Sequence, residues 1–122
     1  MSWSMETGTI PPPSVAERFS HIYEKIALVK EAVARRTLAD LAKDKRTCVA
    51  MERFFEIIGI ASDHIPNEIR KREAEVDWTA IAEMSDRLGN VAIRVEPDTL
   101  LHWAHDLMPP LERCAARLRS PE

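Results

Sequence analysis

The sequence predicts an all-α protein, an antiparallel four-helix bundle with additional short helices. Only three Gly occur in 122 residues, and no segment shows the sustained alternation of apolar and polar residues that is typical of a strand. Apolar residues instead recur at intervals of three and four over long stretches, as they do on one face of a helix. Several of these stretches open with a residue pattern that caps a helix N-terminus.

Residues 1–13 are expected to form a flexible tail, and residues 14–120 a single helical domain. The run Pro11–Pro13 favours extended backbone and cannot donate hydrogen bonds. The first helix should begin after Ser14, because Glu17 follows three residues later as in a capping box. Its apolar face is Phe19, Ile22, Ile26, Val29 and Val33.

The first helix is expected to end at Arg35 and Arg36, since positive charge suits a helix C-terminus. Thr37 and Asp40 repeat the capping pattern and predict a short helix at the corner. A second long helix is expected over residues 45–64, ended by Pro66. Its apolar stripe is Met51, Phe54, Ile58, Ala61 and Ile65, widened by Phe55 and Ile57.

The segment from Val76 to Val95 is the most informative part of the chain. Asp77 is the expected N-cap of a helix that follows one or two helical turns in residues 66–76. Its apolar positions are Trp78, Ile81, Met84, Leu88 and Val91. We expect it to end at Gly89–Asn90, since Gly and Asn tolerate a left-handed C-terminal conformation. A polar run lies within this frame and forms either a candidate site or a solvated helix end: Ser85, Asp86, Arg87 and Asn90.

The last helix is expected to start at Glu96–Asp98, with Pro97 in its first turn. Pro109–Pro110 should kink or break it, because each proline removes a backbone donor and crowds the preceding turn. Its apolar face is Leu100, Ala104, Leu107, Leu111, Cys114 and Leu118, broadened by Trp103.

The charge of the chain excludes a general nucleic-acid binder that works through a basic surface. The net charge is −3, with about +1 in residues 1–61 and about −4 in residues 62–122, so any RNA contact would have to be local. Cys48 and Cys114 fall on apolar helix faces and are expected to be buried free thiols. No stretch is long and apolar enough to cross a bilayer, and we expect a cytoplasmic protein with no membrane partner.

Five separated blocks resemble the HepT-like branch of the HEPN superfamily. They are R-T-x-x-A-x-x-R at 46–53, E-I-I-G-x-A at 56–61, I-P-N-E-I-R at 65–70, W-T-A-I-A-E-M-S-D-R-L at 78–88 and L-M-P-P-L-E at 107–112. The resemblance covers about residues 15–118 and implies an all-α bundle that forms a homodimer, with the 78–88 helix lining a cleft between subunits. Active members resemble metal-independent ribonucleases, so no cofactor or metal is implied. Many are toxins paired with a nucleotidyltransferase antitoxin, which implies that protein or an RNA as a partner.

The active motif of that branch is Arg, four to six residues, then His, commonly followed by any residue and Tyr. Carried onto this chain, the three positions are Ser85, Asn90 and Ala92, so all three are replaced. Asp86 and Arg87 match the branch and are candidate cleft or RNA-binding residues. The antitoxin of the branch modifies the motif Tyr, and Ala92 closes that route because it has no hydroxyl.

These replacements remove the chemistry of cleavage. Imidazole can move a proton near neutral pH, whereas the amide of Asn90 cannot titrate. The hydroxyl of Ser85 carries no charge to stabilise a phosphate. The first hypothesis is therefore a dimeric binding protein with a degenerate nuclease centre. The alternative is an active ribonuclease toxin that uses Arg87 with a histidine outside the motif, and a small-ligand module is a third possibility.

The remaining candidates are interpreted as structural. His102 and His105 lie one turn apart beside an apolar face, which favours a surface role over catalysis or metal binding. Trp78 and Trp103 are expected to be core or interface aromatics. Ile60 replaces the Glu of the branch's G-E-A block and is expected to be buried in packing.

Overall fold

The computed structural model of the chain describes residues 11–90, 92 and 94–121, and all regular secondary structure within these ranges is helical. The elements are α2 (Val15–Val33), α3 (Leu38–Ala42), α4 (Lys45–Asp63), α5 (Asn67–Arg72), α6 (Trp78–Leu88), α7 (Pro97–His102), the π-helical segment η1 (Trp103–Leu107) and α8 (Met108–Leu118). The expected tail lies outside the described residues as far as residue 10, and the expected domain bounds stay a prediction.

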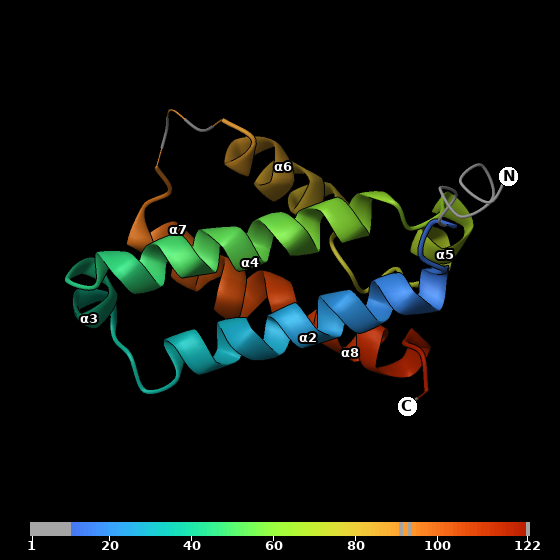
Figure 1. Cartoon of the computed structure of the whole chain (residues 1–122), viewed down its shortest axis with the longest axis horizontal. Coiled ribbons are helices and arrows are strands. Elements are labelled where there is room, and N and C mark those ends of the chain that lie inside the picture. The colour runs from blue at the N-terminus through green and yellow to red at the C-terminus, as the bar shows by residue number, and fades with distance from the viewer. Residues whose placement is uncertain (1–10, 91, 93, 122) are drawn as a thin grey trace, which may run out of the picture.

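Helix α4 is the centre of the bundle. It lies between α2 and α6 along the length of the molecule, and α8 packs against α2 (Figure 1). The inward faces of these helices form one core, in which Phe19, Phe55 and Leu111 are completely buried. Phe55, expected only to widen the stripe of its helix, meets Trp103 edge-on with ring centroids 5.4 Å apart. Trp103 is therefore a core aromatic, as predicted.

The predicted helix starts are confirmed in atomic detail. Ser14 and Glu17 form the reciprocal capping box of α2, and Thr37 and Asp40 form that of α3. The side chain of Asp77 caps α6 by accepting the backbone N–H of Ala80 at 3.0 Å. These caps satisfy backbone donors that have no partner within the helix.

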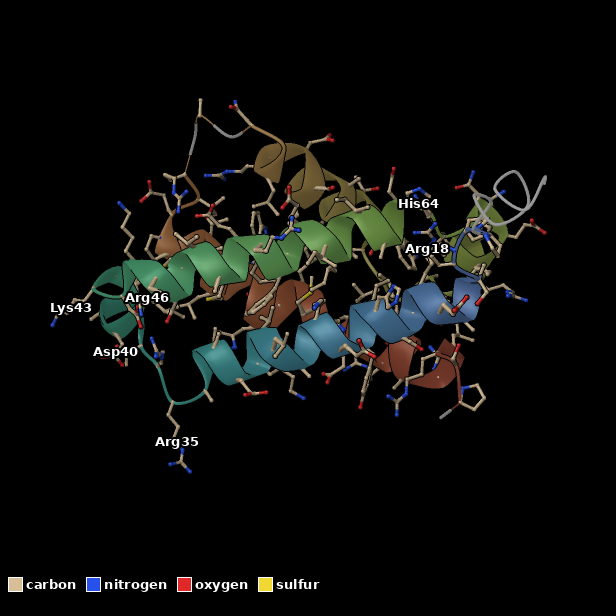
Figure 2. The ribbon with its side chains drawn as sticks, viewed as in Figure 1. Arg18, Arg35, Asp40, Lys43, Arg46 and His64 are labelled. Carbon is tan, nitrogen blue, oxygen red and sulfur yellow. The ribbon has the colours of Figure 1, made fainter. Side chains whose placement is uncertain are left out.

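Two predicted helix ends are wrong in their detail. Helix α2 stops at Val33, and Arg35 adopts φ = 60°, the one positive φ among the described residues. That conformation brings Cβ close to the following carbonyl and costs any residue other than Gly about 1–2 kcal/mol. The Arg35 side chain projects away from the bundle (Figure 2). Gly89 does follow the last residue of α6, but with φ = −69° it is right-handed, and its N–H reaches the carbonyls of Ser85 and Asp86.

The prolines of the last helix do not interrupt its helical course. The irregularity lies before them, in η1, where the N–H of Met108 bonds the carbonyl of Trp103 five residues back. Pro109 and Pro110 then occupy the first turn of α8, where their missing N–H groups are tolerated. The predicted break is therefore absent, with a single π-helical turn before the prolines, and the predicted kink stays a prediction.

Both cysteines are buried free thiols, as predicted. Burial raises the pKa of the Cys114 thiol to about 12, so it stays protonated and packs as an apolar side chain. In the part of the chain that the structure describes, no helix is long and apolar enough to cross a membrane.

Candidate functional site

The polar run of α6 is divided among three cavities. Ser85 and Asp86 line one cavity, Arg87 lines a second, and Asn90 lines a third. Successive helical residues point about 100° apart, so Arg87 faces another side of α6 than Ser85, while the adjacent Ser85 and Asp86 line one cavity. The two motif positions with polar side chains, Ser85 and Asn90, consequently do not share a site in this chain.

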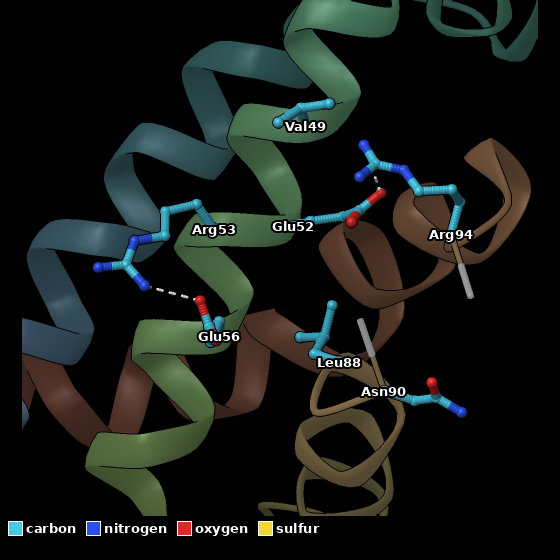
Figure 3. A pocket seen from close by; sticks show the side chains of 7 residues that line it. All are labelled: Val49, Glu52, Arg53, Glu56, Leu88, Asn90 and Arg94. Carbon is cyan, nitrogen blue, oxygen red and sulfur yellow. Dashed lines mark hydrogen bonds and ion pairs between the residues drawn. The ribbon is translucent and has the colours of Figure 1, made fainter. Parts of the chain in front are cut away.

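The Asn90 cavity lies between the N-terminal half of α4 and the segment after α6 (Figure 3). It has a volume of about 200 Å³ and is lined by Val49, Glu52, Arg53, Glu56, Leu88, Asn90 and Arg94. The guanidinium of Arg53 lies 2.7 Å from a carboxylate oxygen of Glu56, and that of Arg94 lies 3.6 Å from Glu52. Each cation of the cavity is therefore partly neutralised, and none of the lining residues is a histidine.

Asn90 and Ala92 occupy an exposed turn at the rim of this cavity. The side-chain oxygen of Asn90 accepts the backbone N–H of Ala92 at 3.2 Å, which holds the turn. Its amide points away from Glu52 and Arg94 (Figure 3). Val91, expected to continue the apolar face, lies outside the described residues.

Ser85 faces α4 at Gly59, where the two helices approach closely. A Cβ atom on residue 59 would lie only 2.7 Å from Oγ and 2.9 Å from Cβ of Ser85. The closeness of these contacts means that Gly at 59 and a small side chain at 85 fit each other. A cavity of about 100 Å³ lies beside this contact and is lined in part by Ser62, Arg70, Trp78 and Asp86.

The wall of the Ser85 cavity is fixed by Arg70. Its guanidinium donates to the carbonyls of Ser62 and Ile65, both at 2.9 Å, and lies over the ring of Trp78. The indole N–H of Trp78 donates in turn to the carbonyl of Glu73 at 3.1 Å. Arg70 thus bonds two backbone carbonyls at and just beyond the C-terminal end of α4, and we interpret its role as structural.

Arg87 shares its cavity with a histidine, a juxtaposition that sequence spacing did not reveal. The cavity is about 250 Å³, and its lining includes Arg87, Thr99, His102 and Trp103. Nδ1 of His102 lies 2.8 Å from a carboxylate oxygen of Asp106, one turn further along. The carboxylate can only accept, so this bond places a proton on Nδ1 of a side chain that is 64% exposed. Arg87 and His102 lie fifteen positions apart, on helices that only the tertiary fold brings together.

Ile60 is half exposed, which corrects the expectation that it is buried. Its exposed fraction is 50%, and that of Val49 is 42%. The two residues are eleven positions apart on α4, which is about three full turns, so they lie on one face of the helix. This outward face of α4 thus carries two exposed apolar side chains, with the ion pair of Arg53 and Glu56 between them.

Comparison with known proteins identifies the family. The profile of the family described as "Ribonuclease HepT-like" matches residues 22–118. The chain belongs to the HepT-like ribonuclease family. The match includes α4, α6 and all three cavities, so the described site lies within the part that defines membership.

Three curated relatives are similar to this HepT-like chain. "Probable ribonuclease HepT" of Thermococcus cleftensis is 33% identical over 98 residues, which cover 80% of this chain and 89% of the relative. "Putative RNase TTE0752" of Caldanaerobacter subterraneus is 35% identical over 68 residues, covering 56% of this chain and 61% of the relative. "Gamma-glutamylcyclotransferase and putative RNase MJ0434" of Methanocaldococcus jannaschii is 36% identical over 69 residues, covering 57% of this chain and 31% of the relative. No solved structure matches the chain.

The contact between Gly59 and Ser85 yields a test of the α4–α6 interface. Gly59→Ala should lower the free energy of unfolding, because overpacking costs about 1–3 kcal/mol and the helix preference of Ala returns about 1 kcal/mol. In a Ser85→Gly background the crowding is gone, and the same change should stabilise the protein. Chemical unfolding of the four proteins measures the coupling, expected at about 1–3 kcal/mol. Additive effects of the two changes would contradict the close approach.

Proposed function

We propose that this HepT-like chain has a degenerate nuclease centre and acts as a dimeric binding protein related to toxin–antitoxin pairs. Its ligand is an RNA, held without cleavage, or a nucleotidyltransferase antitoxin. Membership of a ribonuclease family favours RNA. A cytoplasmic location accompanies this proposal.

The composition of the Asn90 cavity carries the proposal. Metal-free cleavage of RNA needs a group that moves a proton and a cation that stabilises the charged phosphate. The Asn90 cavity contains no imidazole, and its two guanidinium groups lie beside Glu52 and Glu56. Ser85, at the position of the motif Arg, is directed at Gly59 of α4 rather than into this cavity. The motif positions therefore supply surfaces for binding but no catalytic pair.

The outward face of α4 supports the homodimer. Val49 and Ile60 are exposed apolar residues on that face, and Val49 also lines the Asn90 cavity. Burying these side chains against a second copy would remove apolar surface from water. A contact there would enclose the Asn90 cavity between two subunits.

Sedimentation velocity at micromolar concentration tests the dimer. The natural chain should sediment as a dimer, and Ile60→Asp should shift it to monomer because a carboxylate would be buried without a partner. Leu38→Asp is the matched control, since Leu38 is equally exposed at 48% but lies on α3. A monomeric natural chain, or equal effects of the two variants, would contradict the proposed interface.

The cavity shared by Arg87 and His102 favours a second candidate function, ribonuclease activity at a site outside the motif. Nε2 of His102 would take the proton of a ribose 2′-hydroxyl, and the 2′-oxygen would attack phosphorus. The bond from phosphorus to the 5′-oxygen would break, with water supplying the proton to that oxygen. The products would be a 2′,3′-cyclic phosphate and a 5′-hydroxyl, and Arg87 would stabilise the charged phosphate.

A cleavage assay on purified tRNA and mRNA separates the two candidates. The natural chain should leave both RNAs intact. Reversion of the motif, by Asn90→His with Ala92→Tyr and with or without Ser85→Arg, should raise cleavage, because acid–base catalysis is worth about 10²–10⁴-fold. The variant without Ser85→Arg is included because a long side chain at residue 85 would clash with α4. Circular dichroism checks that each variant folds.

Cleavage by the natural chain would contradict the first candidate. If Arg87→Ala and His102→Gln then each abolished that cleavage while His105→Gln left it unchanged, the second candidate would be correct. His105 is the matched control, because it is an exposed histidine of the same helical segment and does not line the Arg87 cavity.

A further inference from the structure

Positive charge is concentrated at one corner of an otherwise acidic molecule. Residues 34–46 contain five of the seventeen Lys and Arg and only two of the twenty Asp and Glu, a net charge of +3. The rest of the chain therefore carries −6. The corner joins the end of α2 to the start of α4 through α3 (Figure 1). Four of its cations are exposed, and we call them the basic corner: Arg35, Lys43, Lys45 and Arg46.

The two carboxylates of this segment, Asp40 and Asp44, form hydrogen bonds or ion pairs with residues outside the basic corner. They therefore do not pair with its four cations. Asp44 lies 2.6 Å from Arg36 and also caps α4 by accepting the N–H of Thr47 at 3.1 Å. Hydrogen bonds from Arg36 and Thr47 hold the pKa of Asp44 well below its usual range. Asp40 accepts the N–H of Thr37 at 2.9 Å in the capping box of α3. Among the described residues, no ion pair involves a member of the basic corner.

Arg35 is a poor choice for its backbone position if folding alone is considered. Its φ of 60° favours Gly, yet a long cationic side chain stands there, exposed and directed into solvent (Figure 2). Its guanidinium makes no hydrogen bond to another described residue. A side chain that brings no contact to the fold at a strained position points to a contact outside it.

The basic corner continues along α4 toward the Asn90 cavity. Arg46, Val49 and Arg53 are separated by three and four positions, so they follow one face of the helix. Val49 and Arg53 line the Asn90 cavity, and Arg94 borders it from the opposite side. Exposed cations thus lead from the corner to a cavity of about 200 Å³ that can receive an unpaired base.

We propose that the basic corner binds the phosphate backbone of single-stranded RNA and directs the strand along α4 to the Asn90 cavity. This inference rests on the proposed RNA-binding function and names the surface that performs it. Phosphates are the natural partners of clustered Lys and Arg, and the chain belongs to a ribonuclease family. A lipid surface is less well matched, because Leu38 on the five-residue α3 is an isolated exposed apolar side chain.

Fluorescence anisotropy with a labelled single-stranded RNA tests the proposal. The RNA should be about twenty nucleotides long, which exceeds the roughly 4–16 nucleotides that one single-strand binding site typically covers. The test variant is Arg35→Gly with Lys43→Gln and Arg46→Gln. Glycine is chosen at 35 because the backbone favours it, so the variant should fold, which circular dichroism verifies. Lys71→Gln with Arg72→Gln is the matched control, since these are exposed cations on α5 at the other end of α4 (Figure 1).

The test variant should bind RNA about tenfold more weakly than the natural chain at low salt. The loss of affinity should be the same for RNAs of unrelated sequence, because phosphate contacts do not read the bases. The slope of log affinity against log salt should fall by about 0.7 for each phosphate that the variant no longer neutralises. Equal weakening in the test and control variants would overturn the basic corner while leaving RNA binding intact. A natural chain that binds no RNA would overturn the proposed ligand as well. Binding to phosphatidylserine vesicles but not to RNA would show that the corner is a lipid site instead.

Discussion

The close approach of α4 and α6 at Gly59 and Ser85 positions the helix that carries the candidate site residues. Because residue 59 has no Cβ, Ser85 lies directly against α4, while Arg87 and Asn90 line two other cavities. Asn90 follows the C-cap residue Gly89 of α6 and lines a cavity together with Glu52 and Arg94. This small-residue contact therefore belongs to the packing of α6 on α4, and Ser85 is not among the residues that line the Asn90 cavity.

The division of the polar run among different cavities is the basis for proposing binding without cleavage. On the Asn90 side, carboxylates accompany the guanidinium groups, and a proton-transfer group is missing from the lining. On the Arg87 side, a histidine oriented by Asp106 does share a cavity with a cation, but on an exposed surface: the side chains of His102 and Asp106 are 64% and 68% exposed. Water screens charges at such a site and weakens their effect on a transition state. We therefore favour binding over cleavage as the role of this HepT-like protein.

Capping patterns and apolar periodicity predict the helices of this chain well. The features that they miss depend on contacts between residues far apart in the sequence. The caps at Ser14, Thr37 and Asp77 depend on residues three positions apart, so the sequence suffices to find them. The sequence predicts a left-handed residue at Gly89–Asn90, but among the described residues that conformation occurs at Arg35, because no local pattern marks a strained arginine. The sequence predicts a buried Ile60, which is in fact half exposed, because apolar character alone does not tell which face of a helix meets the core. The cavity of Arg87 and His102, and the uncompensated charge of the basic corner, depend on tertiary contacts and on which carboxylates are already engaged.

Chemical-shift mapping by NMR with an RNA whose 2′-hydroxyls are methylated, so that it cannot be cut, tests the central claim most directly. That claim is that the bundle binds RNA away from any catalytic pair. The account predicts a continuous band of shifted backbone amides from Arg35 and Lys43 along α4 to Arg53 and Arg94. Shifts centred instead on Arg87, His102 and Asp106, with the basic corner unchanged, would contradict it.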